Sequence, residues 1–415
     1  MSSFLQASPP SGIGFLEVQS CPICDSGSIS RVAYLPGYPL TEFFSQTAID
    51  EGDGYRLDQA LLVCENCAHV FLERQIESTL LYGNHYQTRS AGSSGSVKAL
   101  ERLVHFMQGF EDIGTFDLCI DVGANDGTLL KKLPGYGFMG RRVGIDPSSL
   151  NWSDGIEGHT CFAEEVDFNS IVSGTDAALL IASHVLEHVS DPVGLFRTLA
   201  SSMRSRDRLL VQFPALEPMG AQLRFDQVHH QHYHYFSWFS FSEMLRLSGL
   251  EAVAVNIDWD HYGSATCLLK RSSRSDLILE VNAWNDAWTG LGGLRGIAFG
   301  GLQERFQTFV NFQKSVDLSL TSTSFLALGA GLMSPIVFYH LPGGRNNCIS
   351  IIDDDENKWG RRYCGTPSVI GEVPKSLSGK TVLISGAVSK IAGRALTARA
   401  FDLDARSVVV PILNI

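Results

Sequence analysis

The stretch Cys119–Leu130 constrains the fold more than any other part of this 415-residue chain. Phe116–Val122 is predicted to form a short buried strand, and Gly123 and Gly127 bracket a turn after it. Leu129 and Leu130 begin the apolar side of a helix. A strand, a glycine-bracketed turn and a helix N-terminus form a binding crevice at the carboxyl end of the strand. The sequence therefore predicts an α/β domain with a ligand site at this turn.

The turn differs from the loops that bind phosphates. It contains no G-x-G-x-x-G or G-x-x-x-x-G-K-[ST] run, and it carries Asn125 and Asp126 but no lysine. A neutral or cationic ligand suits it better than a pyrophosphate. Val143–Pro147 is predicted as the next strand, and the carboxylate of Asp146 at its end can accept hydrogen bonds from both hydroxyls of a ribose. The alternative is a plain βαβ unit with a tight turn, but the acidic strand end and the missing phosphate loop favour a nucleoside.

Together the two stretches resemble motifs I and II of class I S-adenosylmethionine (SAM) methyltransferases. The resemblance implies a Rossmann-like central domain with SAM as cofactor. Cys161–Glu165 fits the third strand and its turn, where the position of Glu164 would read the adenine. The cofactor-binding residues that we expect on this basis are Asp121, Gly123, Asn125, Asp126, Gly127, Asp146, Pro147, Glu164, Ser183 and His184.

Two further apolar runs predict the fourth and fifth strands, at Ala177–Ser183 and Leu209–Pro214. The fourth runs into His184–Pro192, which places two histidines and a glutamate at the carboxyl end of a strand. The spacing H-x-x-E-H matches a zinc motif of metalloproteases, but that motif belongs on a long helix. Here it follows a buried strand and Pro192 comes soon after, so we do not interpret this run as a zinc motif.

Two C-x-x-C pairs, Cys21 with Cys24 and Cys64 with Cys67, are the strongest metal signal. Each pair forms one tight knuckle, and two knuckles supply four sulfurs for a tetrahedral Zn²⁺. Four thiolates leave no open position for a reacting ligand, so the predicted site is structural. Two unrelated pairs or a redox pair are the alternatives, and neither pair has the βαβ context of a redox motif.

Composition limits the class of protein. A chain of this length holds two or three domains, and 44% hydrophobic with 18% charged residues is typical of globular proteins. A formal net charge of −12 argues against a nucleic-acid partner. No run of about 18 apolar residues and no signal pattern occurs, so we expect a cytoplasmic protein without a membrane partner.

The segment Leu81–Ser90 is polar and aromatic, and it includes Tyr86. It is interpreted as a lid over the site or as a linker only. Residues 97–110 have the apolar spacing of an amphipathic helix that leads into the central strand.

Phe225–Ser237 is the stretch with the densest chemistry. Four of the chain's twelve histidines lie between positions 229 and 234. A solvated polar loop or an adventitious metal site are the alternatives to an active-site loop. The four aromatic residues of the stretch and the suitability of imidazole for proton abstraction near neutral pH favour an active-site loop.

In its order of parts, from Cys21 to about Ile412, the chain resembles the nucleotide-sugar C-methyltransferases of deoxysugar biosynthesis. That family combines an N-terminal zinc domain, a central SAM domain and a C-terminal Rossmann-like domain, here expected at residues 1–90, 91–272 and 273–415. Its motif D-x-[IV]-Y-H-E-H-x-x-Y-F-S corresponds to Asp226–Ser237. The final histidine of the motif, the proposed general base of the family, matches His232, and the family's histidine after the fourth strand matches His188. The expected catalytic residues are His232, His229, His230, Gln231, His188 and Tyr86.

The chain departs from the family motif at two positions. The tyrosine of the motif is His229 here, and its glutamate is Gln231, which cannot carry charge or accept a proton. The turn at 261–264 is expected to precede an edge strand at Ala265–Leu269.

The C-terminal part shows the pattern of a second α/β unit. Residues 275–318 are expected to be helical, and strands are expected at Phe325–Leu328 and Ile349–Asp354. Lys358 and Gly360 match the K-x-G part of the family motif D-x-x-x-x-K-x-G, whereas the lysine of the preceding family motif and the closing W-N are absent.

These features favour a SAM-dependent C-methyltransferase that acts on a nucleotide-activated ketosugar or a related polar small molecule. His232 would remove a proton next to a carbonyl, and the resulting carbanion would attack the methyl group. Methyl transfer to oxygen or nitrogen is the first alternative. A non-catalytic or NAD-linked scaffold is the second.

Overall fold

The computed structural model describes residues 13–45, 55–82, 89–92, 94–148, 152, 155–272, 301–386 and 390–412. Its largest element is a seven-stranded sheet with the strand order β13-β14-β11-β10-β7-β8-β9. The strands from β11 to β9 are parallel, β14 is antiparallel to β11, and β13 is antiparallel to β14. The strands are β7 (Leu118–Val122), β8 (Arg141–Ile145), β9 (Ile156–His159), β10 (Ala178–Ser183), β11 (Arg208–Pro214), β13 (Leu250–Asp258) and β14 (Ser264–Arg271).

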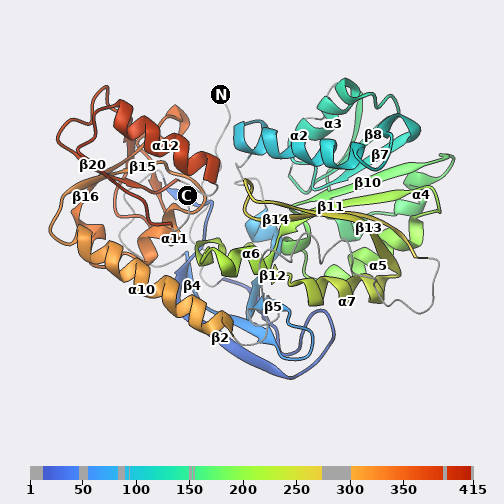
Figure 1. Ribbon diagram of the computed structural model, residues 1–415, viewed down its shortest axis with the longest axis horizontal. Helices are drawn as coiled ribbons and strands as arrows, with labels where there is room; N and C mark the ends of the chain where they lie inside the picture. Colours follow the sequence, from blue (N-terminus) through green and yellow to red (C-terminus); the bar gives the residue numbers. More distant parts are fainter. Residues whose placement is uncertain are drawn as a thin grey trace.

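Helices cover both faces of this sheet (Figure 1). Because side chains alternate along a strand, Ile120 and Val122 of β7 join the core under α4, α5 and α7, whereas Cys119 joins the core under α2 and α3. The helices are α2 (Ser94–Gln108), α3 (Thr128–Lys132), α4 (Phe168–Val172), α5 (Pro192–Ser202) and α7 (Trp238–Ser248). The predicted α/β class of the central region is confirmed.

The position of the third strand was predicted wrongly. β9 comprises Ile156–His159, and Ala163–Glu165 forms a short 3-10 helix in place of a strand. The apolar run that would have marked β9 is missing because Trp152 supplies the bulk instead. A Cβ on Gly158 would lie 1.8 Å from Trp152 Cδ1, so the indole ring occupies the space over a strand that carries little apolar side chain of its own.

The strand expected at Ala265–Leu269 was predicted wrongly to lie at the edge of the sheet, because it is part of β14, the second strand from the edge. β14 pairs with β11 on one side and with β13 on the other, so β13 forms that edge of the sheet. The expected helix at 275–318 corresponds to α10, Leu302–Leu320, and residues 275–300 lie outside the described residues.

The N-terminal region forms a four-stranded sheet of order β12-β5-β4-β2. Its strands β2 (Ile29–Pro39), β4 (Arg56–Cys64) and β5 (Val70–Leu72) come from the region of the cysteine pairs, but β12 (His234–Tyr235) comes from the histidine-rich stretch. The pair β1 (Phe15–Glu17) and β6 (Arg74–Ile76) and the helix α1 (Ser78–Leu81) complete the region. The histidine-rich stretch therefore belongs to the N-terminal sheet as well as to the central region.

The C-terminal region is a parallel five-stranded sheet of order β18-β16-β15-β19-β20. A Cβ on Gly329, which has a φ of +96°, would lie 2.8 Å from the Cα of Gly386, so glycine is needed where β15 and β19 end side by side. The elements are β15 (Phe325–Leu328), β16 (Cys348–Asp353), β18 (Ile370–Glu372), β19 (Thr381–Ile384), β20 (Ser407–Val409), α10, α11 (Ser334–Tyr339) and α12 (Lys390–Asp402).

One apolar core joins the three regions. It contains Leu61 of β4, Phe225 and Val228 of the histidine-rich stretch, Phe309 of α10 and Ile336 of α11. In addition, β3 (Phe44–Ser45) pairs with β17 (Arg362–Tyr363) of the C-terminal region. Figure 1 shows β2, β4 and β5 below and between the central and C-terminal regions.

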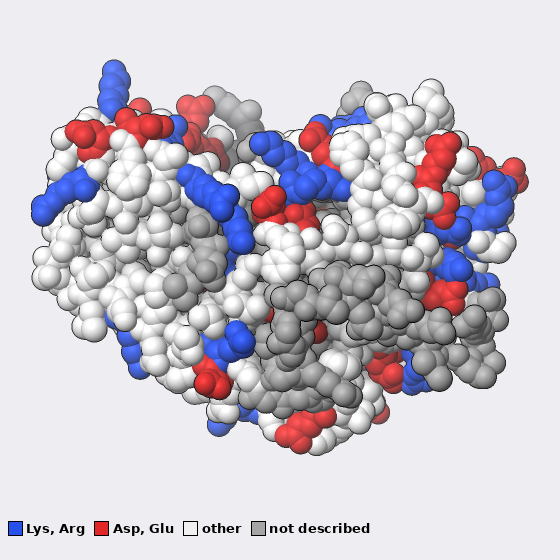
Figure 2. Space-filling view, viewed as in Figure 1, with Lys and Arg blue, Asp and Glu red and all other residues white. Residues whose placement is uncertain are grey.

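Charged side chains of both signs are interspersed on the face drawn in Figure 2. Within the described ranges, none of the helices has the length and apolar character needed to cross a lipid bilayer.

Candidate active site

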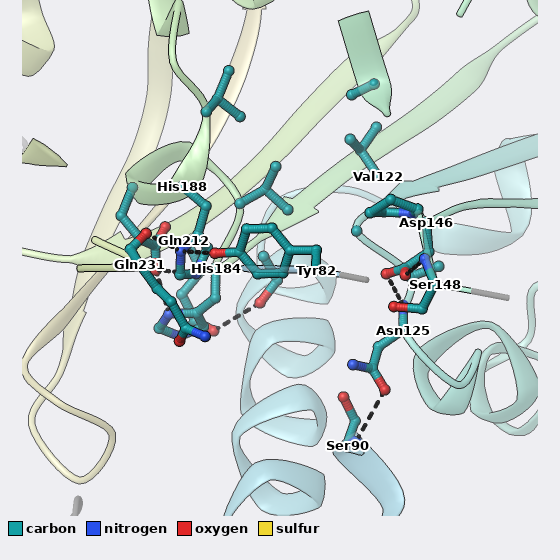
Figure 3. A pocket seen from close by; sticks show the side chains of 18 of the residues that line it. Tyr82, Ser90, Val122, Asn125, Asp146, Ser148, His184, His188, Gln212 and Gln231 are labelled. Atoms are coloured by element: carbon teal, nitrogen blue, oxygen red, sulfur yellow. Dashed lines mark hydrogen bonds and ion pairs between the residues drawn. The ribbon is translucent and has the colours of Figure 1, made fainter. Parts of the chain in front are cut away.

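A cavity of about 300 Å³ lies at the carboxyl ends of the parallel strands β7, β8, β10 and β11. Figure 3 shows its two ends, with Asp146 and Asn125 at one and His184, His188 and Gln231 at the other. Parallel α/β sheets place their ligands at this edge. The first end is called the carboxylate end below, and the second the imidazole end.

The glycine turn shapes the carboxylate end. Gly123 has a φ of +72°, and a Cβ there would lie 2.4 Å from Val185 Cγ2. The Gly123 amide donates to the carbonyl of Ile145 at 2.8 Å, which ties the turn to the end of β8. Asn125 lines the cavity from the same turn with a φ of +49°, a conformation that asparagine tolerates better than most residues.

Asp146 is held by its own loop. Its Oδ2 accepts the amide of Asn125 at 2.8 Å and its Oδ1 accepts the amide of Ser148 at 2.8 Å, and the residue is 7% exposed. A carboxylate has about four lone-pair sites, so two sites are still available to ribose hydroxyls.

Asp121, also at this end, is buried. Burial raises the pKa of Asp121 well above its usual value, and the nearby Asp146 and Asp126 raise it further. A cationic ligand would relieve the repulsion among these carboxylates.

Most of the residues predicted to bind the cofactor line the cavity, and two do not. The cavity is lined by Asp121, Gly123, Asn125, Asp146, Pro147, Glu164, Ser183 and His184. Asp126 and Gly127 are not among the described residues that line the cavity. Asp126 Oδ1 accepts the amide of Thr128 at 3.1 Å and Oδ2 accepts the amide of Ala91 at 2.9 Å, while Gly127, with a φ of +72°, is the N-cap of α3. Both have a structural role in beginning α3.

The imidazole end brings together segments about forty residues apart. His184 Nδ1 lies 2.9 Å from Glu187 Oε1, and His188 Nδ1 lies 2.7 Å from the carbonyl oxygen of Gln231. The ring centroids of His188 and His232 are 4.9 Å apart.

His229 completes this end of the cavity. The ring centroids of His229 and His232 are 3.9 Å apart. The candidates His188, His229, Gln231 and His232 all line the cavity.

Burial favours the neutral form of three imidazoles at this end, because it lowers the pKa values of His188, His229 and His232. Burial lowers the pKa of His232 well below its usual value, and the neighbouring His229 and His188 lower it further. Burial also lowers the pKa of His229, with His188 and His230 adding to the effect. For His188, burial lowers the pKa although Glu187 opposes the shift. A neutral imidazole can accept a proton or bind a metal ion.

His230 does not take the place predicted for it. It is fully buried outside the cavity lining, where Nε2 lies 3.1 Å from the carbonyl oxygen of Tyr38 and Nδ1 lies 3.2 Å from Gln59 Nε2. Because a carbonyl only accepts, Nε2 carries the proton and Nδ1 accepts from the amide of Gln59. His230 thus fixes the loop to β2 and β4.

Other contacts hold the same loop from the N-terminal sheet. Tyr38 donates its hydroxyl to the carbonyl of Val228, and the amide of Leu72 donates to the carbonyl of Tyr233 at 2.9 Å. His69 Nε2 lies 3.0 Å from His234 Nδ1. The geometry of the imidazole end therefore depends on a sheet that lies outside the central region.

Several residues that line the cavity were not predicted. Tyr82, whose Oη lies 2.8 Å from His188 Nδ1, falls in the segment interpreted as a lid or linker, whereas Tyr86 lies outside the described residues. Glu187 is part of the H-x-x-E-H run, and His261 and Tyr262 belong to the turn before β14. These three residues lie close in sequence to the ends of predicted strands, and that position could have marked them as candidates for the cavity lining. Leu332 and Met333 of the C-terminal region also line the cavity, and their sequence gave no such signal.

The four cysteines predicted to bind zinc lie together. Cys21 Sγ is 3.6 Å from Cys67 Sγ, and Cys24 Sγ is 3.6 Å from Cys64 Sγ. These separations exceed a disulfide bond and match the edge of a tetrahedron with Zn–S bonds of about 2.3 Å, which is roughly 3.8 Å. A hydrogen bond from Cys67 lowers the pKa of Cys21 to about 6, which favours the thiolate that binds metals. The donor set fits Zn²⁺.

Residues 97–255 match the model of a family described as "Methyltransferase domain". The chain is 23% identical over 252 residues to a protein named C-methyltransferase NovU from Streptomyces niveus, covering 60% of this chain and 59% of that protein. The chain thus matches less than two thirds of the length of that relative.

Two solved structures of methyltransferases are similar to part of the chain, at low sequence identity and low TM-score. The 1,6-didemethyltoxoflavin-N1-methyltransferase of Burkholderia thailandensis is 14% identical with a TM-score of 0.35, covering 47% of this chain and 87% of that one. The magnesium protoporphyrin IX methyltransferase of Synechocystis PCC 6803 is 15% identical with a TM-score of 0.32, covering 43% and 80%.

The central region is a class I SAM-dependent methyltransferase domain. This conclusion rests on the family match over residues 97–255, the seven-stranded sheet with its antiparallel β14, and the carboxylate-lined turn after β7.

Proposed function

We propose that the whole chain is a SAM-dependent C-methyltransferase that acts on a polar small molecule with an acidic C–H group next to a carbonyl, such as a nucleotide-activated ketosugar. The observation that supports it most is the cavity itself, which holds a carboxylate end and a cluster of neutral imidazoles in one space. The similarity to a protein named C-methyltransferase supports transfer to carbon.

SAM supplies an electrophilic methyl group when it is bound. At the carboxylate end, Asp146 would accept the ribose hydroxyls, and the described lining residues include Asp121, Asp146 and Glu164 but no lysine or arginine. Such a set suits a ligand with a sulfonium and an ammonium group.

At the imidazole end, a base from the His229–His232 pair would take the proton from the acceptor carbon. The resemblance to the sugar C-methyltransferases favours His232. Proton abstraction by a positioned base contributes about 10²–10⁴-fold to a rate. His188 would position the acceptor or the base, since its Nδ1 is held by the carbonyl of Gln231.

The cysteine cluster is proposed to hold one structural Zn²⁺. Cys64 ends β4, and β4 carries Gln59, which bonds to His230 of the histidine loop. Zinc would thus stabilise the sheet on which the imidazole end is built.

Methyl transfer to oxygen or nitrogen is the alternative, because Gln231 cannot serve as the carboxylate of the family motif. The test is incubation of the purified protein with ¹³C-methyl-labelled SAM and a panel of nucleotide ketosugars. A product heavier by one methyl group, with the label bonded to carbon by NMR, is expected. A label on oxygen or nitrogen would replace the proposal with the alternative, and tight SAM binding without any product from this panel would reject this acceptor class.

A further inference from the structure

We propose that the imidazole end of the cavity is a second metal site, in which Glu187, His188 and His232 bind a divalent first-row transition metal. The inference rests on the proposed function for the acceptor, and it assigns the role of base to His229, the other member of the His229–His232 pair. Metal binding is measurable without turnover. The ligand set differs from the helical H-x-x-E-H zinc motif, since one of the three ligands comes from the histidine loop.

The three ligand atoms already lie close together. One side-chain nitrogen or oxygen from each of Glu187, His188 and His232 is within 4.8 Å of the other two. His188 Nε2 is 3.9 Å from Glu187 Oε1. Ligands bound at about 2.0–2.2 Å to one ion are roughly 3–4 Å apart, so closure around a metal takes shifts of about 1 Å or less.

Buried acceptor atoms without hydrogen-bond partners favour the binding of a cation at this end. Within the described residues, Glu187 Oε2, His232 Nδ1, His229 Nδ1 and His184 Nε2 have no hydrogen-bond partner. Glu187 is 1% exposed and lines the cavity. An unsatisfied buried polar group costs about 1–3 kcal/mol, and more when it is charged. A bound cation would satisfy the carboxylate oxygen and the imidazole nitrogen together.

The surrounding hydrogen bonds set the tautomers that metal ligation needs. The Gln231 carbonyl can only accept, so His188 Nδ1 carries a proton and Nε2 keeps its lone pair. His184 Nδ1 donates to Glu187 Oε1 and leaves Oε2 open. His232 Nδ1 is buried without a hydrogen-bond partner, so this nitrogen is available as the ligand atom. Outer partners of this kind orient metal ligands in proteins.

Two imidazoles and one carboxylate suit Zn²⁺ or Fe²⁺ with open positions for a substrate. An acceptor carbonyl oxygen would occupy one of them. If His232 holds the metal, His229 would be the base that takes the proton from the acceptor carbon. The metal would supply positive charge next to the acceptor oxygen, and the carbon would bond to the methyl group as the S–CH₃ bond breaks and S-adenosylhomocysteine leaves.

The test is titration of Co²⁺ into the purified chain that already carries zinc at its four cysteines, followed by absorption spectroscopy. One equivalent should bind with the spectrum of a nitrogen–oxygen site and without thiolate charge-transfer bands. Glu187→Gln and His232→Ala should each weaken Co²⁺ binding at least about 10-fold. His261→Ala is the matched control, because His261 lines the same cavity outside the ligand set. Its Co²⁺ affinity should stay unchanged.

The SAM affinity and melting temperature of each variant are measured first and should be unchanged, so that misfolding is not mistaken for loss of metal binding. If Glu187→Gln fails this check, it is replaced by Glu187→Ala. If His232→Ala fails it, it is replaced by His232→Asn. Absence of Co²⁺ binding, or equal binding by the wild type and both ligand variants, would overturn the inference. Methyl transfer that persists without the second metal also overturns the inference and leaves the proposed function standing. If Co²⁺ binds at this site but the protein methylates no ketosugar, the proposed function is rejected and the inference of a second metal site stands.

Discussion

Replacement of Asp146 by asparagine tests the carboxylate end of the cavity. In the wild type, Asp146 Oδ2 accepts the amide of Asn125 and Oδ1 accepts the amide of Ser148, both at 2.8 Å. Asparagine keeps the shape of the side chain but loses its charge and one acceptor oxygen. In either orientation of the new amide, its NH₂ group faces an N–H donor.

The expected magnitude follows from the hydrogen bonds that Asp146 is proposed to accept from the ribose. A hydrogen bond to a charged group contributes about 1.5–3 kcal/mol, which corresponds to roughly a 10- to 150-fold rise in Kd for SAM. Isothermal titration calorimetry of SAM and S-adenosylhomocysteine measures the change, with the melting temperature recorded in parallel.

Asp126→Asn provides the control for disturbance of the turn. Asp126 also accepts backbone amides, those of Thr128 and Ala91, but it is not among the described residues that line the cavity. The Asp126→Asn variant should lower the melting temperature of the protein with little change in its Kd for SAM. If Asp146→Asn kept the Kd within about 3-fold of the wild type, or if Asp126→Asn weakened SAM equally, Asp146 would not be the ribose ligand.

Three further predictions concern the zinc site, the base and pH. Cys64→Ser should reduce zinc at the cysteine cluster from about one per chain towards zero and lower the melting temperature, as measured by mass spectrometry and calorimetry; unchanged stability without zinc would contradict a structural role. His232→Ala should lower kcat by roughly 10²-fold or more with SAM affinity retained, whether His232 is the base or holds the proposed metal, and Gln231→Glu should be tolerated if the chemistry is carbanion formation. Intact turnover in His232→Ala would favour a proximity-driven transfer to oxygen or nitrogen. Burial lowers the pKa of His230 from 6.5 to about 4. Between these two pH values the unfolded chain binds a proton at His230 that the folded chain does not bind. The free energy of unfolding therefore falls by up to about 3 kcal/mol as the pH drops from 6.5 to 4. In urea titrations at pH 7 and pH 5, His230→Gln should lose less stability on acidification than the wild type, and an equal loss would show that His230 is not protonated on unfolding.

The strands under the cavity were predictable because each leaves a local signal. β7, β10 and β11 are buried on both faces, so they appear in the sequence as mainly apolar runs, with Asp121 in β7 and Gln212 in β11 as polar interruptions. The turn after β7 needs glycine at 123, and that need is also visible locally.

The roles of adjacent histidines were not predictable in the same way. His229 and His230 are neighbours in a loop without a helical or strand period, and only the first lines the cavity. His230 is turned away by the carbonyl of Tyr38 and the amide of Gln59, which lie more than 170 residues earlier in the chain. No pattern within the loop records those contacts.

The two ends of the cavity therefore depend on different parts of the chain. The carboxylate end is built by consecutive segments, β7 with its turn and β8 with Asp146, which bond to each other directly. The imidazole end needs the N-terminal sheet to hold the histidine loop, and the core that joins this loop to α10 and α11 extends the dependence to the C-terminal region. Because the elements proposed to bind SAM are local and those proposed to bind the acceptor are not, the methyl donor could be inferred from motifs. The proposals for the acceptor and for a second metal required the position of the histidine loop on its supporting sheet.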